Sequence, residues 1–592
     1  MKILNLLNNS TCEMSFRFQL SYVFLCYGLY FLNFVALIKP TTVSSSISSS
    51  NGTDEQALLA IKFRIESDPF QFLTSWNNSF HFCSWHGVRC NTMDQRVTAL
   101  NLSSLEIGGA LPTSIGNLTF LEELILDNNL FHGTIPRELS QLVHLQHISL
   151  YNNSFHGEIP GNLTYPAIRI INLERNNLEG EIPAELGSSK NLLELYLSNN
   201  QFKGTIPRSL GDLADLRVLS VSDNFLEGSI PEELGKLSNL EFLKLSSNKL
   251  SGVVPMQLFK ISSIQYLNLA SNHLNGIFPS DFGLNHSRLH TFVVAENQFF
   301  GSLPLSIANA SGIVILDIGA NALSGPIPMN IGNLKHLQRL DFSKHPLEST
   351  DSTGLNFLTS LTNCTNLRIL HLNANNHGGA LSSSVANLST KLTSLRLDKN
   401  YITGGIPDNL ENLVNLDNLA MSQNMLTGRI PTFIGKLTRL EGLYLSGNKF
   451  IGEIPGSIGN ITQLSVLEMR GNVLDGSIPV SLGNCTRLQG LDLSHNRLTG
   501  VIPEEVFGLS SLTYNLNLAH NLLSGPLPSV VVKLKNLGSL DISNNRLSGE
   551  LPVSIGDCQF LEFLSLQGNV LNGQIPESLD GLMSIQLLDL SR

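Results

Sequence analysis

The stretch LEELILDNNLFHGTIP, residues 121–136, recurs along the whole chain with small changes. It returns as LRVLSVSDNFLEGSIP at residues 216–231 and as LQGLDLSHNRLTGVIP at residues 488–503, so the shared pattern is LxxLxLxxNxLxGxIP. The Asn slot repeats every 23–25 residues with a single 30-residue step, and 18 of its 20 positions hold Asn, the exceptions being Leu105 and His345. A fixed period of this length predicts a stack of repeats, each of which buries the apolar side chains of its neighbours.

Each position of the pattern has a physical reason. The two leucines of LxL point to one face of a short strand, and the residue between them points to the other face. The Asn amide has donors and an acceptor for backbone groups that would otherwise be buried without partners where the chain leaves the strand. The Gly allows a positive φ or a close backbone approach, and the Pro fixes φ on the return path. We therefore expect a leucine-rich repeat with a parallel sheet on its concave side.

The extension GxIPxxIGNL resembles the plant-specific class of leucine-rich repeat over residues 97–592. The resemblance implies an α/β solenoid: a superhelix with a parallel β-sheet on the concave face and short strands and 3₁₀ turns on the convex side. The region would hold about 20 full repeats and a truncated twenty-first, whose leucine slots are filled by Ile585, Leu588 and Leu590. We expect the chain to stop before a carboxy-terminal cap, a transmembrane helix and a kinase.

Residues 53–96 precede the first repeat and are expected to form its amino-terminal cap, because an uncovered first repeat would expose its leucine layer. The pair Thr53 and Gln56 has the spacing of a helix capping box. The apolar residues that follow recur on one helix face: Ala57, Leu58, Ile61 and Ile65.

The segment CSWHGVRC resembles the paired-cysteine segment of the amino-terminal cap in plant leucine-rich-repeat receptors. The resemblance implies a disulfide between Cys83 and Cys90 with Trp76 and Trp85 packed nearby. A metal site formed by Cys83, His86 and Cys90 is the alternative, although a secreted cap with two cysteines favours the disulfide.

Residues 1–46 are interpreted as a signal peptide with a leader. Arg17 precedes the 19-residue uncharged stretch at residues 20–38, which is followed by a Ser/Thr-rich exit. The stretch is also long enough to remain as a membrane anchor. Entry into the secretory pathway agrees with twelve N-glycosylation sequons after residue 50, at Asn51, Asn77, Asn101, Asn117, Asn152, Asn162, Asn285, Asn309, Asn363, Asn387, Asn460 and Asn484.

The composition and motifs argue against several functions. The net charge is −11 and the chain has no basic run, so nucleic acid is not an expected partner. The tripeptide DFG at residues 281–283 lacks the other kinase motifs around it, and His144 and His147 lack further metal ligands. We expect no catalytic residues, metal or cofactor, and we interpret Cys364, Cys485 and Cys558 as buried thiols in leucine slots.

One repeat breaks the pattern, because His345, Ser349 and Ser352 replace its Asn, Gly and Pro and six residues are added. Such a repeat is either a binding element or a tolerated insertion. Its continuation FLTSLTNCTNL resembles an insert in a subgroup of plant receptor kinases that includes receptors sensing bacterial peptides and a rice blight-resistance receptor. In that subgroup the repeats form an extracellular sensor, followed by a transmembrane helix and a cytoplasmic Ser/Thr kinase.

A long, shallow repeat surface fits a peptide or protein ligand better than a small molecule, which needs a deep pocket. Aromatic and Arg side chains are enriched at binding hot spots. Our candidate ligand-binding residues lie between or after the strand leucines: Tyr151, Arg175, Tyr196, Phe242, Lys244, Tyr266, His371, Arg396 and Lys399.

The expected function is therefore that of an extracellular ligand-recognition domain of a plant receptor kinase at the plasma membrane. It would bind a ligand and a co-receptor, itself expected to contain leucine-rich repeats, and start immune or developmental signalling. The alternative is a receptor-like protein without a kinase, or a secreted wall-associated inhibitor of a pathogen enzyme.

Overall fold

The computed structural model describes residues 51–345 and 355–591, and residues 53–592 form one unit. The predicted signal peptide and the positions Ser349 and Ser352 lie outside the described residues. Among the described residues no helix is long and apolar enough to cross a membrane.

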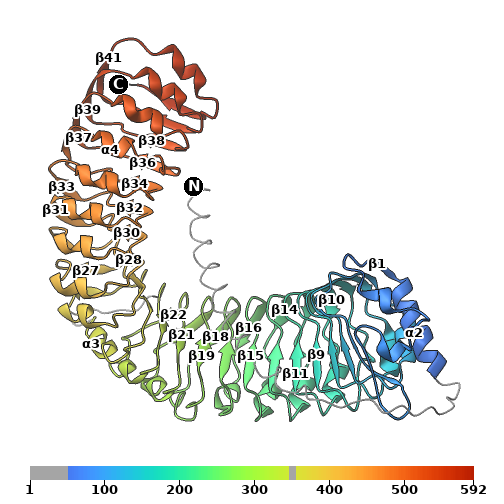
Figure 1. Ribbon diagram of the computed structural model, residues 1–592. Helices are drawn as coiled ribbons and strands as arrows, with labels where there is room; N and C mark the ends of the chain where they lie inside the picture. Colours follow the sequence, from blue (N-terminus) through green and yellow to red (C-terminus); the bar gives the residue numbers. More distant parts are fainter. Residues whose placement is uncertain (1–50, 346–354, 592) are drawn as a thin grey trace. The chain divides into compact units, whose positions relative to one another are not determined.

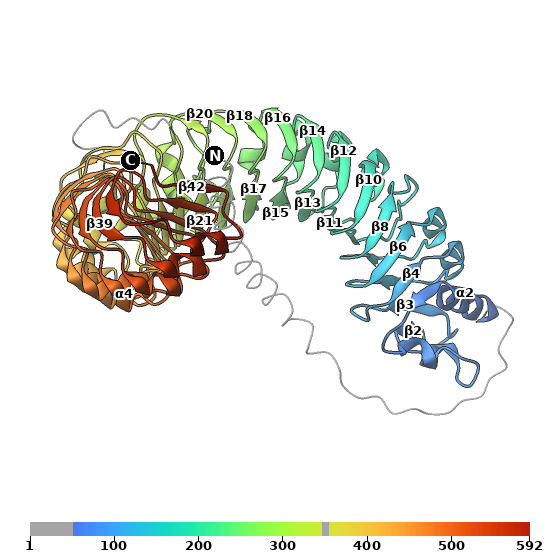
Figure 2. The ribbon, with the colours of Figure 1, turned by 90° about the horizontal axis from the view of Figure 1, so that it is seen from above.

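One long sheet, here called the inner sheet, runs through the unit. Its strands pair in a single line from β2 to β42, and every pairing is parallel except the antiparallel pair of β2 and β3. Figure 2 shows β11 to β17 on the inner side of the bend of the repeat stack, and this exposed side of the sheet is called the inner face. The strands are β2 (Val88–Cys90), β3 (Val97–Asn101), β5 (Glu123–Ile125), β7 (His147–Ser149), β9 (Ile170–Asn172), β11 (Glu194–Tyr196), β13 (Val218–Ser220), β15 (Phe242–Lys244), β17 (Tyr266–Asn268), β19 (Thr291–Val293), β21 (Ile315–Asp317), β23 (Arg339–Asp341), β24 (Ile369–His371), β26 (Ser394–Arg396), β28 (Asn418–Ala420), β30 (Gly442–Tyr444), β32 (Val466–Glu468), β34 (Gly490–Asp492), β36 (Asn515–Asn517), β38 (Ser539–Asp541), β40 (Phe563–Ser565) and β42 (Leu587–Asp589).

A second row of short strands, the lateral strands, follows the turn after most inner strands (Figures 1 and 2). These strands form sheets of eleven, two, three and four strands. They are β1 (Ile65–Ser67), β4 (Gly108–Ala110), β6 (Leu130–Thr134), β8 (Ser154–Gly157), β10 (Asn177–Glu181), β12 (Gln201–Gly204), β14 (Phe225–Gly228), β16 (Lys249–Val253), β18 (His273–Gly276), β20 (Gln298–Gly301), β22 (Ala322–Leu323), β25 (Gly378–Ala380), β27 (Tyr401–Thr403), β29 (Thr427–Gly428), β31 (Lys449–Glu453), β33 (Val473–Asp475), β35 (Thr499–Gly500), β37 (Leu522–Gly525), β39 (Arg546–Glu550) and β41 (Val570–Asn572).

Short helical turns close most repeats on the convex side. A proline usually precedes the turn in an extended conformation and accepts its first hydrogen bond, as Pro136 does from the Leu139 N–H. The elements are η3 (Thr113–Asn117), η4 (Arg137–Gln141), η5 (Ala184–Ser188), η6 (Arg208–Asp212), η7 (Glu232–Lys236), η8 (Leu258–Lys260), η9 (Leu305–Asn309), η10 (Ile331–Asn333), α3 (Phe357–Leu361), η11 (Ser383–Asn387), η12 (Asp408–Asn412), η13 (Thr432–Lys436), η14 (Gly456–Asn460), η15 (Val480–Asn484), α4 (Glu504–Phe507), η16 (Ser529–Lys533), η17 (Val553–Asp557) and η18 (Glu577–Gly581).

The Asn slots form a ladder of buried amides. Asn200 donates from Nδ2 to the carbonyl of Leu173, one repeat earlier, at 2.9 Å. The same Nδ2 lies 3.2 Å from the carbonyls of Leu197 and Ser198 in its own turn. Its Oδ1 accepts the Leu178 N–H at 3.0 Å. Each amide therefore pairs backbone groups of two repeats, which confirms the role predicted for the Asn slot.

The turn around each ladder Asn uses left-handed backbone twice. The slot four residues on holds Gly at positive φ, for example +75° at Gly204, as the pattern predicted. The residue directly before the Asn also has a φ near +55° in most repeats, although it is not Gly. Arg175 and Lys399 occupy that second position, at φ +58° and +57°.

The cap comprises α2 (Asn51–Phe63), β1, η1 (Phe72–Ser75), η2 (Phe82–Ser84) and β2. Two details differ from the sequence prediction. The helix begins at Asn51, so Thr53 lies within its first turn, and Ile65 lies in β1, which pairs antiparallel with β4 instead of extending the helix face. The predicted residues Ala57, Leu58 and Ile61 are buried against the first repeats.

A buried ion pair joins the cap to the repeats. Arg96 donates from Nε and Nη2 to the two carboxylate oxygens of Asp54 at 2.9 and 2.7 Å. Asp54 also accepts the backbone N–H of Val97, at the start of β3. Burial of both groups in this geometry fixes α2 on the end of the inner sheet.

Candidate ligand-binding face

The structure places the first six candidate residues together on the inner face between β7 and β17. The rings of Phe242 and Tyr266 stack with centroids 4.2 Å apart on neighbouring strands. The Arg175 guanidinium lies over the Tyr151 ring at 5.8 Å. Tyr196 is half-buried on β11. We call these six residues, Tyr151, Arg175, Tyr196, Phe242, Lys244 and Tyr266, the aromatic cluster.

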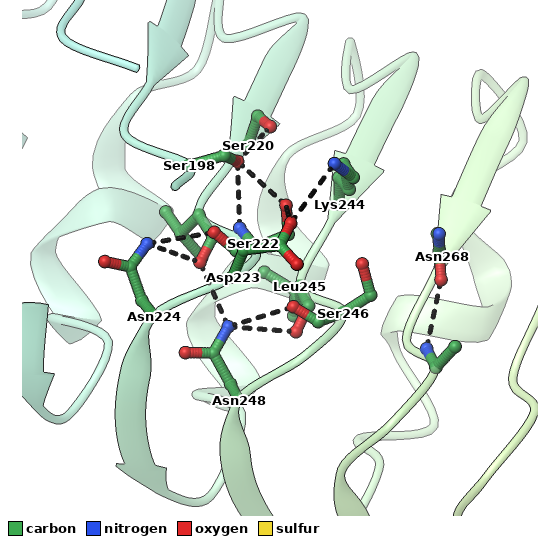
Figure 3. Close-up of polar contacts among 12 residues, drawn as sticks. Ser198, Ser220, Ser222, Asp223, Asn224, Lys244, Leu245, Ser246, Asn248 and Asn268 are labelled. Atoms are coloured by element: carbon green, nitrogen blue, oxygen red, sulfur yellow. Dashed lines mark hydrogen bonds and ion pairs between the residues drawn. The ribbon is translucent and has the colours of Figure 1, made fainter. Parts of the chain in front are cut away.

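An ion pair holds Lys244, one of the two basic members of this cluster, in place (Figure 3). Lys244 Nζ lies 3.6 Å from Asp223 Oδ2, and Figure 3 shows the lysine reaching back across the inner sheet to that carboxylate. The buried hydroxyls of Ser198 and Ser220, also drawn in Figure 3, are 2.6 Å apart. Burial raises the pKa of the nearby Glu174 carboxyl, although the positive charges of Lys244 and Arg175 oppose the rise.

A second polar group, the central network, crosses β21, β23, β24 and β26. Arg339 Nη2 lies 3.0 Å from Asp317 Oδ2 and 3.3 Å from Asp341 Oδ2. His371 contacts Asp341 Oδ2 through Nδ1 at 2.9 Å and Ser394 Oγ through Nε2 at 3.0 Å. The network therefore links five side chains from four neighbouring strands.

The two carboxylates of this network have opposite pKa shifts, although both are buried. Burial and then the charge of Asp341 raise the pKa of Asp317. Burial also acts to raise the pKa of Asp341, but the hydrogen bond and charge of His371 and the charge of Arg339 outweigh it, so that this pKa is lowered. Asp341 is therefore the carboxylate that keeps its negative charge beside His371.

The remaining candidates lie on the same part of the inner face. His371 is a member of the central network and pairs in register with Arg396 on β26. Arg396 Nε lies 3.4 Å from Asp398 Oδ1, while Lys399 is exposed at the rim. Sequence reasoning selected His371 but missed its partners Asp317, Arg339, Asp341 and Ser394. No single repeat position marks these partners, because Asp317 and Asp341 end their strands whereas Arg339 and Ser394 begin theirs.

The cysteines are structural. Cys83 and Cys90 form a disulfide with their Cα atoms 5.5 Å apart, so the alternative metal site with His86 is not formed. The indoles of Trp76 and Trp85 stack beside it with centroids 5.5 Å apart. The three thiols interpreted as core residues, Cys364, Cys485 and Cys558, are buried, and burial raises the pKa of each to about 11.

Side chains of the other rejected motifs make ordinary packing contacts with neighbouring rings. Phe282 of the DFG tripeptide is buried among Phe259, Phe278 and Phe292. His144 stacks on Phe120 with ring centroids 5.7 Å apart. Within residues 51–345 and 355–591, no three His, Cys, Asp or Glu side chains converge as metal ligands do.

The described sequons are accessible, and glycosylation remains a prediction. Asn77 is half-buried and Asn51 has no described side chain, whereas the other ten asparagines are exposed. Six of these ten occupy the same place on the convex side, at or just after the helical turn: Asn117, Asn309, Asn363, Asn387, Asn460 and Asn484.

Comparisons with known proteins agree with the repeat and the cap. The leucine rich repeat N-terminal domain matches residues 51–91, and leucine rich repeat models match residues 216–274 and eight further segments between residues 120 and 582. The crystal structure of the Arabidopsis receptor kinase HAESA, in complex with the peptide hormone IDA and the co-receptor SERK1, is 31% identical. The alignment covers 91% of this chain and 93% of that one, with a TM-score of 0.77. The chain belongs to the leucine-rich-repeat ectodomains of plant receptor kinases.

Two further relatives of this ectodomain extend the comparison. The ectodomain of GASSHO1/SCHENGEN3 from Arabidopsis thaliana, solved with CASPARIAN STRIP INTEGRITY FACTOR 2, is 33% identical over 91% of this chain and 72% of that one, with a TM-score of 0.76. The LRR receptor-like serine/threonine-protein kinase EFR of Arabidopsis thaliana is 40% identical over 100 residues, which are 17% of this chain and 10% of EFR. The first curated relatives are matched over 8 to 10% of their own length.

Proposed function

We propose that this ectodomain recognises an extracellular peptide or protein ligand on its inner face. The observation that carries the proposal is the aromatic cluster. Within it the rings of Phe242 and Tyr266 stack, and Arg175 lies over the Tyr151 ring. Lys244 pairs with Asp223, and Tyr196 lies half-buried on β11 between the two pairs of residues. Aromatic and Arg side chains of this kind provide large contact areas at low entropic cost, which is typical of binding hot spots.

The dimensions of the cluster favour an extended peptide. From β7 to β17 the cluster crosses six parallel strands in register. At about 4.8 Å per strand spacing this is a track of about 24 Å, the length of about seven extended residues. A peptide lying across the strands would meet an aromatic or basic side chain on most of them.

The partners and cellular role follow from the relatives as proposals. HAESA is solved with a peptide hormone and a co-receptor, and we propose that a leucine-rich-repeat co-receptor joins this ectodomain in the same way. We further propose that the ectodomain faces the cell exterior and belongs to a longer receptor with a transmembrane helix and a serine/threonine kinase. The resemblance of the irregular repeat to receptors that sense bacterial peptides supports an immune role.

The test uses the secreted chain and a displayed library of random 12-residue peptides as the probe. The affinities of selected peptides are measured by calorimetry for the unchanged chain and for Tyr196→Ala with Tyr266→Ala. Removing two aromatic hot-spot side chains is expected to weaken binding by tenfold or more, since each costs about 1–2 kcal/mol.

The matched control is Tyr401→Ala, because Tyr401 is exposed on the lateral strand β27, away from the inner face. It should leave the affinities unchanged. Selected peptides that tolerate the double substitution, or lose affinity equally with Tyr401→Ala, would overturn the assignment of the inner face.

A further inference from the structure

Two buried histidines interrupt the repeat pattern in neighbouring repeats. His345 occupies a ladder slot that holds Asn in 18 of 20 repeats, and His377 occupies the core position two residues after Asn375, where Leu178 and Leu226 lie in other repeats. Both side chains are 3% exposed. They belong to the repeats whose inner strands are β23 and β24, on either side of the long step in the array.

The polar atoms of these two imidazoles are poorly matched by their surroundings. His345 Nδ1 lies 3.1 Å from the carbonyl oxygen of Asn321. This single contact replaces only some of the hydrogen bonds that a ladder Asn makes. His345 Nε2 and both ring nitrogens of His377 have no hydrogen-bond partner among the described residues. The Phe357 ring packs against His377 with centroids 6.0 Å apart.

The charged groups around the pair give it little support as a cation. Asp341 is the acidic group that acts on His345, but its carboxylate already binds Arg339 and His371. The neighbouring charged group that acts on His377 is His345, which is also positive when protonated and therefore disfavours protonation of His377. Burial is the main cause that lowers the pKa of each histidine to about 4, and the charge of His345 contributes to the lowering at His377.

We propose that the layer containing His345 and His377 is an acid-responsive joint, at which the repeat array opens locally when the two imidazoles take up protons. A buried histidine that must stay neutral destabilises the closed state as the pH falls below the pKa of the opened state. Opening here would separate the aromatic cluster from His371, Arg396 and Lys399, which lie beyond β23. Acid would then uncouple the two parts of the inner face without unfolding the ends of the array.

The expected size of the pH effect on the opening equilibrium follows from the pKa of each histidine in the opened and in the closed state. With a pKa of about 6.5 when opened and about 4 when closed, the opening equilibrium rises about tenfold per histidine between pH 7.5 and 5.5. The two together give about a hundredfold.

The chain contains its own probe and controls. Cys364 is a buried thiol in the same layer, three residues after α3, and its Sγ lies 3.4 Å from the Leu334 carbonyl oxygen. Cys485 and Cys558 are buried in the equivalent slot of later repeats. The rate of labelling by dithiodipyridine is measured for each thiol by mass spectrometry at pH 7.5 and 5.5. The ratio of Cys364 to Cys485 cancels the intrinsic pH dependence of thiol chemistry.

The ratio should rise about a hundredfold on acidification in the unchanged chain. It should rise about tenfold in His345→Asn and in His377→Leu, and stay constant in the double variant. Both substitutions restore the residue that the repeat pattern favours, so loss of folding is not the expected result. The proposal would be overturned if the labelling ratio of the unchanged chain did not change with pH, or if the ratio of the double variant rose by the same factor.

Discussion

Replacing one rung of the amide ladder tests how the repeats are held together. Asn224 donates from Nδ2 to the carbonyls of Leu197, Val221 and Ser222 at 3.1, 3.2 and 3.0 Å, and its Oδ1 accepts the Phe202 N–H at 3.0 Å. In Asn224→Ala four contacts to buried backbone groups are lost. At about 1 kcal/mol each, the local stability should fall by about 4 kcal/mol.

Hydrogen exchange measured by mass spectrometry is the appropriate assay, because a long repeat array need not unfold in one step. A loss of about 4 kcal/mol corresponds to exchange about a thousandfold faster in peptides covering residues 197–226. Peptides near residues 396–424 should be unaffected. The matched control is Asn239→Ala, an exposed asparagine whose amide donates one hydrogen bond, to the Ala214 carbonyl at 3.1 Å. If Asn224→Ala exchanges no faster than Asn239→Ala, the ladder does not stabilise the repeats as we argue.

Two further predictions concern the cap and the inner face. Asp54→Ala leaves the buried Arg96 guanidinium without its partner and should destabilise the cap by about 3–5 kcal/mol in a denaturant titration followed by tryptophan fluorescence. Arg89→Gln, which breaks only an exposed pair, should cost at most about 1 kcal/mol, and equal losses would contradict this account of the junction. Arg396→Gln with Lys399→Asn should weaken binding of the peptides selected above; Asn tolerates the positive φ at position 399, and an unchanged affinity would remove these residues from the ligand face.

The regular part of the fold follows from the sequence because each repeat position has a local physical role. The Asn amides, the positive-φ glycines and the prolines before the helical turns all act within one repeat or between neighbours. Their geometry is therefore fixed by the period itself. The disulfide between Cys83 and Cys90 was predicted from the resemblance of the cap segment to plant receptor caps, and the structure confirms it.

The central network could not be predicted in this way. Its contact between Asp341 and His371 spans 30 residues and crosses the irregular repeat, where the period gives no register. The burial of His377 was not predicted from the sequence either, because histidine is a polar residue type that usually lies at the surface. Ile65 was assigned to a helix face since its spacing fits one, but pairing of β1 with β4 overrides that local preference.

The ladder also determines which changes of chain length the array can absorb. In regular repeats the amide reaches a carbonyl 27 residues back, as Asn200 reaches Leu173, whereas Asn375 reaches Phe342 across 33 residues. Asn375 Oδ1 still accepts the His345 N–H, so the rung is kept although the sequence between the two slots is six residues longer. Loss or gain of a complete repeat would likewise leave every ladder amide beside an equivalent turn of the neighbouring repeat. Removal of half a repeat would leave one ladder amide without such a turn. Such an array can change its length in whole repeats, and each added repeat extends the inner face by one strand.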